Sequence, residues 1–401
     1  MSQGLKQHRP EKMPIDLLGL SDELAIDNLE SLDVDVILFR VLQVLELGDF
    51  QQRWDVAKII PRLGSIAIKP LIEILQDDNA DLDFRWFAGR ILGEFQEPEV
   101  IDGLLQVLQT ADNEDLMAMA AANLANFGNS AIAALSSLLQ QEETRFLATR
   151  SLAHIRTPET IDALLSVVND RLPNVRSTAI EALASFHDDR IPPILIAALK
   201  DTSALVRKEA AIALGYRAYL AIELDLVNHL QPLLYDINIQ VCQQAAIAIG
   251  RLKTDTAATA LFQVLASPYT PASLQIDIIR ALGWMETPQA LEYLQQALTL
   301  DFAVESVSIY QEIIAILSRV KHPDLITKAT DILIDFLPNT HNYAIKQSIA
   351  MGFRELGDIR SITPLIQLLT DSDNGVRLYA ISALKYIAPE DLYQQIIGNY
   401  S

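Results

Sequence analysis

A short phrase that recurs along most of the chain constrains its fold more than any other sequence feature. In Asp201–Gly215, an Asp is followed after six residues by an Arg, after three more by an Ala and after another four by a Leu. Residues 170–183 and 371–384 repeat this spacing. A fixed period of about 30 to 35 residues is typical of a solenoid, in which each repeat stacks on the next.

Eleven positions along the chain align with the Arg of this phrase, and we call them anchors. The residues three and seven positions after each anchor are all apolar. That spacing places both on one face of an α-helix. Ala is the commonest residue at the first of these positions, where it allows a neighbouring helix to approach closely. The anchors are Arg53, Arg85, Met117, Arg145, Arg176, Arg207, Cys242, Gln275, Tyr310, Lys346 and Arg377.

A short break, often with Pro or Gly, follows each phrase and leads into a second apolar segment, as in residues 68–75, 100–108, 161–168 and 362–369. A single helix pair cannot bury both apolar faces, but stacked pairs can. The chain is therefore predicted to be an all-α, right-handed α-solenoid of about eleven helix pairs, end caps included. We expect the second helices to line its inner surface.

The ends of the chain depart from the repeat pattern. Residues 1–13 are predicted to be a mobile tail, and residues 14–48 an N-terminal helical cap that includes a helix from Val34 to Leu47. The repeat array is then expected over residues 49–373, and a C-terminal capping repeat over 374–401.

Charge and cysteine content exclude several classes of partner. The net charge is −21, which repels phosphate backbones and anionic membrane surfaces, so neither nucleic acid binding nor membrane insertion is expected. A basic protein would be attracted. The lone Cys242 and the start of the chain, which has no apolar core of the signal-peptide type, favour a cytoplasmic location. No catalytic motif is present, and the histidines lack metal-ligand spacing, so no cofactor or metal is expected.

The phrase resembles the HEAT repeat in its Asp, its Val-Arg pair, its two spaced Ala residues and its Leu, and in the helix with Pro-Leu-Ile that follows. Over roughly residues 50 to 390, the chain is most similar to the subclass of HEAT repeats found in phycobilisome (PBS) lyases. That subclass includes bilin lyases of cyanobacterial light-harvesting proteins, phycobilisome-degradation proteins and a long member associated with an A-type iron–sulfur carrier. In length and unbroken repeats, the chain most resembles the long member.

The Asp and Arg of the phrase allow two interpretations. They could form a charged binding row or a structural ladder, in which each Asp caps a helix or pairs with the Arg of a neighbouring repeat; we favour the ladder. Its members are Asp170, Arg176, Asp201, Arg207, Asp371 and Arg377. Cys242 stands at an anchor position in place of Arg. Its thiol either contacts a partner or a partner's iron–sulfur cluster, or it is a small buried hydrophobic residue.

Aromatic residues are the candidates for protein binding. The position after the anchor is polar at Ser177, Lys208 and Gln243, and therefore expected to face water, but it is aromatic at Trp54, Trp86 and Phe146. Stacking of repeats should place the two Trp residues side by side. They form either an exposed docking patch or a surface covered by the cap, residues 14–48.

Further aromatic candidates lie elsewhere. Tyr269 and Tyr343 belong to segments 267–271 and 337–343, which read as protruding loops, and Tyr293 is among the outward residues of a second helix.

Two functions follow from these observations. The first is a non-enzymatic scaffold or adaptor whose solenoid surface binds a protein. The resemblance implies that this partner is an iron–sulfur assembly carrier or a phycobiliprotein. The second, which would make the chain an enzyme, is a bilin lyase or lyase subunit that attaches a tetrapyrrole to a phycobiliprotein cysteine.

Overall fold

The structure is a computed structural model that describes residues 34–300, 302 and 306–400, and within them every regular element is a helix. The predicted tail, 1–13, and the first part of the predicted cap, 14–33, lie outside the described residues. The chain divides into two compact units, Met1–Leu183 and Ala184–Ser401, and the boundary falls within the predicted repeat array.

Each anchor lies on an α-helix of its own, as the repeat spacing predicted. The residues three and seven positions after the anchors are fully buried, with no exposed surface at any of the twenty-two positions. The anchor helices are α3 (Phe50–Ile59), α5 (Leu82–Leu92), α7 (Glu114–Asn126), α9 (Glu142–Ile155), α11 (Pro173–Leu183), α13 (Ala204–Gly215), α15 (Ile239–Leu252), α17 (Ala272–Met285), α19 (Ser306–Ser318), α21 (Tyr343–Leu356) and α23 (Asn374–Ile387).

Second helices alternate with the anchor helices along the chain, and several of them adjoin a short 3₁₀ turn. The α-helices of this set are α2 (Val34–Leu47), α4 (Ile68–Gln76), α6 (Pro98–Thr110), α8 (Ile132–Leu138), α10 (Ile161–Leu165), α12 (Ile191–Ala198), α14 (Leu226–Leu230), α16 (Asp255–Leu265), α18 (Pro288–Ala297), α20 (Pro323–Phe336), α22 (Ile362–Leu368) and α24 (Glu390–Tyr400). The 3₁₀ turns are η2 (Ile60–Ala67), η3 (Gly128–Ala131), η4 (Pro158–Thr160), η5 (Ala218–Leu220), η6 (Gln231–Tyr235), η7 (Leu337–Asn339) and η8 (Ile359–Ser361). α2 coincides with the helix predicted at the end of the cap.

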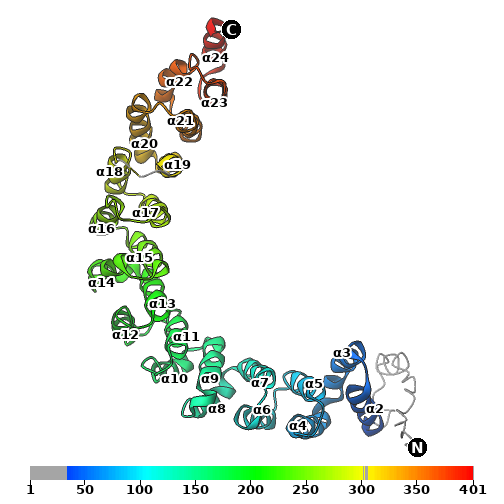
Figure 1. The fold of residues 1–401 in the computed structure, drawn as a ribbon. Helices are drawn as coiled ribbons and strands as arrows, with labels where there is room; N and C mark the ends of the chain where they lie inside the picture. The colour runs from blue at the N-terminus through cyan, green and yellow to red at the C-terminus, as the bar shows by residue number, and fades with distance from the viewer. Residues whose placement is uncertain (1–33, 301, 303–305, 401) are drawn as a thin grey trace, which may run out of the picture. The chain divides into compact units, whose positions relative to one another are not determined.

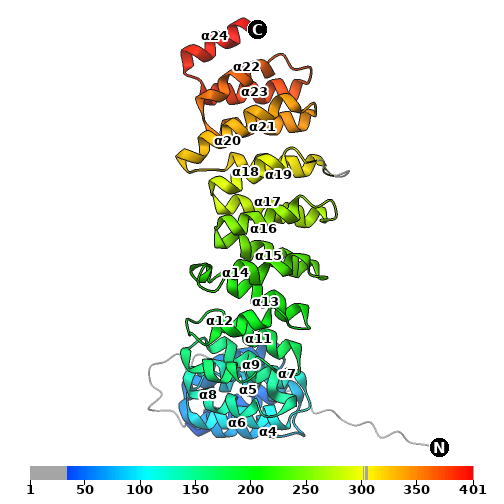
Figure 2. The same cartoon turned by 90° about the vertical axis from the view of Figure 1, so that its left-hand side faces the viewer.

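The two sets of helices form two layers within each unit (Figures 1 and 2). In each unit taken by itself, the row of helix pairs is curved, with the even-numbered helices on its convex side and the anchor helices on its concave side (Figure 1). The anchor helices therefore form the inner layer. The prediction that the second helices line the inner surface is therefore wrong.

Small residues explain why the anchor helices lie inside. A Cβ atom added to Gly215 of α13 would lie 2.9 Å from the Cα of Ala248 on α15. One added to Gly250 of α15 would lie 2.9 Å from the Cβ and the carbonyl oxygen of Ala281 on α17. These helices therefore touch almost backbone to backbone. Because close spacing shortens the anchor layer relative to the other layer, the row bends toward it.

The Asp and Arg residues of the phrase form a polar ladder, as the structural interpretation proposed. The anchor Arg donates from Nη1 to the main-chain carbonyl of the Asp six residues earlier, which closes the turn before its own helix. This bond is 2.7 Å long in Arg176–Asp170, Arg207–Asp201 and Arg377–Asp371.

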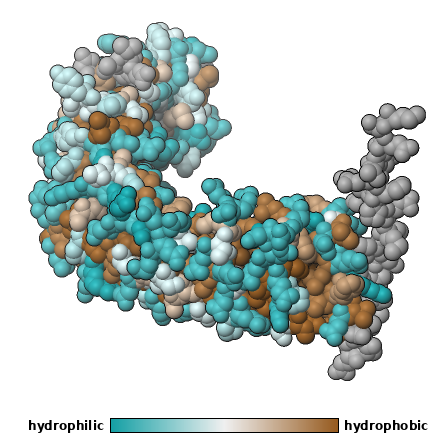
Figure 3. Space-filling model, turned by 60° about the horizontal axis from the view of Figure 1, so that its bottom comes forward, coloured by the Kyte–Doolittle hydropathy of each residue, from teal (hydrophilic) through white to brown (hydrophobic). Residues whose placement is uncertain are grey.

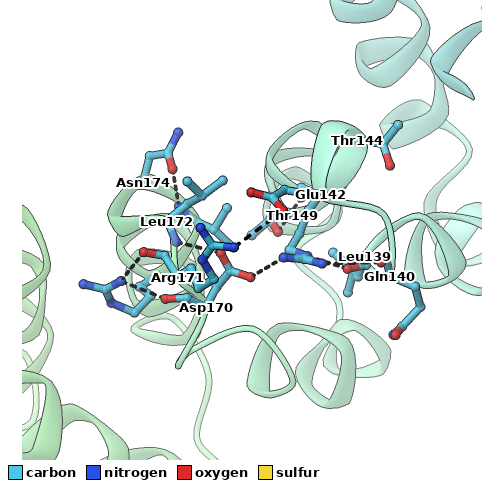
Figure 4. A network of polar contacts seen from close by, with 12 residues as sticks. Leu139, Gln140, Glu142, Thr144, Thr149, Asp170, Arg171, Leu172 and Asn174 are labelled. Atoms are coloured by element: carbon cyan, nitrogen blue, oxygen red, sulfur yellow. Dashed lines mark hydrogen bonds and ion pairs between the residues drawn. The ribbon is translucent and has the colours of Figure 1, made fainter.

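The Asp carboxylates join consecutive repeats within a unit. In the first unit, Asp170 accepts a hydrogen bond from Arg145 of the preceding repeat at 2.8 Å and from the main-chain N–H of Leu172 at 2.8 Å (Figure 4). Arg145 also donates to the carbonyl oxygen of Leu139 at 2.6 Å. In the second unit, Lys346 contacts Asp371 in the same way at 2.7 Å. The ladder thus satisfies loop carbonyls and fixes the register of neighbouring repeats.

Candidate functional site

Four aromatic rings form a cluster on the anchor layer of the first unit. Trp54 of α3 and Trp86 of α5 lie side by side, with ring centroids 6.3 Å apart and planes at 70°. Phe87 contacts both indoles edge-to-face, with centroids 5.4 Å from each. Phe50 contacts Trp54 and Phe87 and is 69% exposed, and both Trp side chains are half-buried. The cluster therefore presents aromatic surface to solvent among the described residues.

A groove with a volume of about 820 Å³ runs beside this cluster between α5 and α7. Trp86 and Phe87 line it on α5, and Phe50 reaches it from α3. On α7 the facing residues include Ala118 and Ala122, which are too small to fill the space opposite the rings. The groove therefore exists because α7 carries Ala where α3 and α5 carry Trp at the position after the anchor.

Carboxylates surround the aromatic groove. Asp83, Glu94 and Asp115 line it, together with one cation, Arg90, whose Nη1 donates to Glu94 at 2.8 Å. The surrounding sequence, residues 73–115, contains twelve acidic and two basic residues, for a net charge of −10. This stretch carries almost half of the net charge of the chain, −21.

Hydrophobic surface also gathers at the α2–α4 end of the first unit, where Figure 3 shows brown areas. The exposed large hydrophobic residues of that end are Val36, Phe39, Leu47, Phe50 and Ile66. Whether residues 14–33 of the predicted cap cover the Trp pair lies outside the described residues. Both alternatives from the sequence therefore remain hypotheses.

The second unit has a smaller groove on the same layer. It has a volume of about 590 Å³ and lies between α19 and α21. Glu312, Arg319 and Glu355 supply its charged groups, and Met351 and Ile314 its larger apolar surface. The absence of aromatic residues from its lining distinguishes it from the groove of the first unit.

The other aromatic candidates do not join the Trp cluster. Phe146 is half-buried on α9. Tyr269 lies in a turn and is 92% exposed, as its predicted loop requires. Tyr343, the first residue of α21, is partly exposed and its hydroxyl lies 3.2 Å from that of Ser372. Tyr293 lies on α18, a helix of the outer layer, and stacks on Phe262 of α16, with ring centroids 4.5 Å apart.

The segment between α13 and α14, residues 216–225, carries exposed apolar side chains that the sequence analysis did not single out. Tyr219 and Ile222 are exposed in this segment. Arg217 beside them is buried and donates to the carbonyl oxygens of Ala213 at 2.9 Å and Phe186 at 2.8 Å. Burial lowers the pKa of its guanidinium. Arg217 thus fixes the base of a loop whose tip is apolar.

Cys242 makes the same kind of hydrogen bond as the anchor Arg of other repeats, to the carbonyl oxygen of the Asp six residues earlier. It is 3% exposed, and its thiol donates to the carbonyl oxygen of Asp236, six residues earlier, at 3.1 Å. Burial raises the pKa of this thiol. The side chain is not presented at the surface, so a partner or cluster could reach its sulfur only after local opening. The burial agrees with the structural alternative for this residue.

The position after the anchor is less exposed than its polarity indicated. Ser177 is buried, which corrects the prediction that it faces water. Lys208 and Gln243 are half-buried, and Gln243 donates to Asp277 of the next anchor helix at 2.7 Å. Gln243 thus forms a hydrogen bond to the next repeat, whereas the Ser177 hydroxyl donates to the carbonyl oxygen of Asn174 in its own helix at 3.1 Å.

The carboxylates and small residues of the groove were missed by the sequence analysis, which ranked aromatic residues alone. The acidic excess of residues 73–115 could have identified this region. Ala118 and Ala122 gave no signal, because Ala is common throughout the anchor helices.

No group of three or more His, Cys, Asp or Glu side chains that could hold a metal ion occurs within residues 34–300, 302 and 306–400. Among the helices of the same residues, none has both the length and the apolar character needed to cross a membrane.

Comparisons with known proteins identify the repeats. Family models for HEAT repeats match residues 68–146 and 132–215, and a model for the PBS lyase HEAT-like repeat matches residues 274–299. The chain is a HEAT-repeat α-solenoid, as its resemblance implied. The match to the PBS lyase HEAT-like model lies on α17 and α18. A comparison with curated proteins gave no match.

The likeness to importin β supports the same fold. Importin β has a TM-score of 0.56 at 14% identity over 92% of this chain and 62% of the importin. An engineered protein has a TM-score of 0.40 at 20% identity over 92% of this chain and 98% of its own. The complex of CpcE and CpcF of phycocyanin lyase from Nostoc sp. PCC7120 has a TM-score of 0.32 at 20% identity, over 58% of this chain and 94% of that one. Identities this low show a fold and leave function to the site.

Proposed function

We propose that this protein is a non-enzymatic scaffold or adaptor that binds a protein partner on the anchor layer of its first unit. The observation that supports this most directly is the aromatic cluster of Phe50, Trp54, Trp86 and Phe87 beside an open groove. Trp is enriched at the energetic centres of protein interfaces, where a ring fills a pocket on the partner. Phe50 and the half-buried indoles offer such surface without unfolding any element.

We further propose that the partner is a phycobiliprotein or an iron–sulfur assembly carrier. The PBS lyase HEAT-like repeat at residues 274–299 supports the first class. The second class rests on the resemblance in length to the long member of the subclass. Because Cys242 is buried, an iron–sulfur carrier would have to hold its cluster on ligands of its own.

Direct binding of both candidate partners to the full chain tests the proposal. Calorimetry with a phycobiliprotein and, separately, with an A-type carrier should give a complex with one of them. The double variant Trp54→Ala/Trp86→Ala should weaken that complex by at least about thirtyfold, since a single hot-spot residue is worth about 2 kcal/mol or more. The control Tyr269→Ala removes an exposed aromatic ring of the second unit and should leave the affinity within about twofold. Equal losses in both variants would refute this site.

A bilin lyase is the second candidate function, and the same match at residues 274–299 favours it. It requires that the protein take up an open-chain tetrapyrrole and transfer it to a phycobiliprotein cysteine. Incubation with bilin and apo-phycobiliprotein distinguishes the two. Covalent chromophore transfer, followed by absorbance after denaturation, supports the lyase. Unchanged bilin together with a stable protein complex supports the scaffold.

A further inference from the structure

We infer that the groove between α5 and α7 binds an extended, arginine- or lysine-bearing segment of the partner protein. This inference deepens the proposed function and rests on it. Three independent features of the groove carry it: its aromatic wall, the sign of its charges and their spacing along the helices.

The aromatic wall suits a cation. A guanidinium or ammonium group is attracted to the face of an aromatic ring, most strongly to that of Trp. Trp86 lines the groove on one side, and Ala118, Met119 and Ala122 line the other. The side-chain methylenes of Lys or Arg would contact this apolar side while the charged group stays near the indole or the carboxylates.

The charges of the groove also favour a basic occupant. Its lining contains three carboxylates, from Asp83, Glu94 and Asp115, and the single guanidinium of Arg90, which already pairs with Glu94. The nearby basic residue Arg85 is buried and pairs with Asp78 at 2.9 Å, so it contributes no free positive charge at the surface. Glu94 pairs with Arg90, and Asp83 lies 3.9 Å from Nη1 of Arg53. Three carboxylates and one guanidinium still give the lining a net charge of −2, which repels an anionic segment and attracts a basic one.

The carboxylates stand at opposite ends of the groove. Asp83 and Asp115 are the second residues of α5 and α7, and Glu94 follows the end of α5. Glu94 lies eleven positions after Asp83, and α5 forms most of this span, so the two are about 16 Å apart along the helix. An extended chain advances about 3.3 Å per residue, so basic residues about five positions apart would reach both ends. The C-terminal ends of α5 and α7 add negative dipole ends on the Glu94 side.

Labelled peptides test this inference with the full chain. The probe is a fluorescein-labelled decapeptide of alternating Gly and Arg, and the matched control replaces Arg with Glu. Fluorescence anisotropy at physiological ionic strength should show saturable binding of the Arg peptide and no binding of the Glu peptide. Failure of the Arg peptide to bind, or equal binding of the Glu peptide, would overturn the inference.

Charge-neutral variants locate the binding site. Asp83→Asn/Asp115→Asn should weaken binding of the Arg peptide by about tenfold or more. The control Asp324→Asn/Asp335→Asn changes the net charge equally on α20 of the second unit and should alter it by about twofold or less. Equal losses in the two double variants would mean that net charge alone attracts the peptide, and the inference would fail. Circular dichroism verifies that each variant remains folded.

Two further results separate this inference from the proposed function. If Asp83→Asn/Asp115→Asn leaves the protein complex intact while Trp54→Ala/Trp86→Ala abolishes it, the proposed scaffold function stands and the inference of a basic segment in the groove is wrong.

The second result concerns the chain's own N-terminal segment. Residues 1–13 carry Lys6, Arg9 and Lys12. If their removal raises the affinity for the Arg peptide by about tenfold or more, the groove binds this chain's own segment, and the assignment to a partner fails.

Discussion

Arg207 of one repeat forms two hydrogen bonds to the carboxylate of Asp236 in the next, from Nε to Oδ2 at 2.7 Å and from Nη2 to Oδ1 at 2.8 Å. The same guanidinium donates to the carbonyl oxygen of Asp201 in its own repeat. Both partners are largely buried, with side-chain exposures of 14% and 9%. One side chain therefore closes its own turn and ties that turn to the following repeat, which makes this pair the strongest single test of the ladder.

Removing the cation of this pair should destabilise the second unit. Arg207→Met keeps most of the apolar stem but leaves the Asp236 carboxylate without its bidentate donor. We expect the free energy of unfolding to fall by about 1.5 to 3 kcal/mol, the range for a buried charged hydrogen bond. Urea denaturation followed by circular dichroism measures it. The control Lys328→Met breaks the more exposed pair with Glu292 and should cost about 1 kcal/mol or less.

The same pair predicts a loss of stability in acid. Hydrogen bonds from Arg207 hold the pKa of Asp236 below its ordinary value. The folded pKa lies below the unfolded one, so the contribution of this carboxylate is complete above the unfolded pKa of about 3.9 and is lost as the pH falls below it, through the folded pKa. Unfolding midpoints measured from pH 7 down to pH 2.5 should fall less steeply in Asp236→Asn below about pH 4 than in the unmodified protein. Parallel curves would show that Asp236 does not contribute.

Close contact of the anchor helices predicts opposite outcomes at two glycines. Gly250→Ala places a methyl group 2.9 Å from Ala281, which forces α15 and α17 apart. Overpacking of this kind costs about 1 to 3 kcal/mol. Gly398→Ala on α24 meets nothing within 4 Å and should stabilise the helix by about 0.5 to 1 kcal/mol. Thermal unfolding of the two variants checks this, and a neutral Gly250→Ala would show that the helices are not in contact.

Burial of Cys242 predicts slow chemical modification. The thiol is enclosed, and the raised pKa keeps it protonated at neutral pH. Because the thiolate is the reactive form, an alkylating reagent at pH 8 should modify the native protein at least about a hundredfold more slowly than the urea-unfolded chain. Mass spectrometry over time gives both rates. Rapid modification of the native chain would indicate an accessible sulfur, and would revive a thiol contact with a partner.

The sequence predicted the candidate site only in part. The column of residues after the anchors placed Trp54 beside Trp86, because stacked repeats bring equivalent positions together. It did not predict the groove, which depends on the small size of Ala118 and Ala122 on a third helix. Nor did it predict that Ser177 is buried, because its exposure depends on the next repeat and not on its own helix.

Repeat spacing by itself determined the helix pairs, the buried faces of the anchor helices and the pairing of Asp with Arg. These features depend on contacts within one repeat or between equivalent positions, which periodicity encodes directly. Tertiary structure alone decided that the anchor helices form the inner layer, that Cys242 is enclosed and that a groove opens between α5 and α7. Each of these depends on how closely side chains of different repeats pack, and the spacing of one helix pattern does not specify that distance.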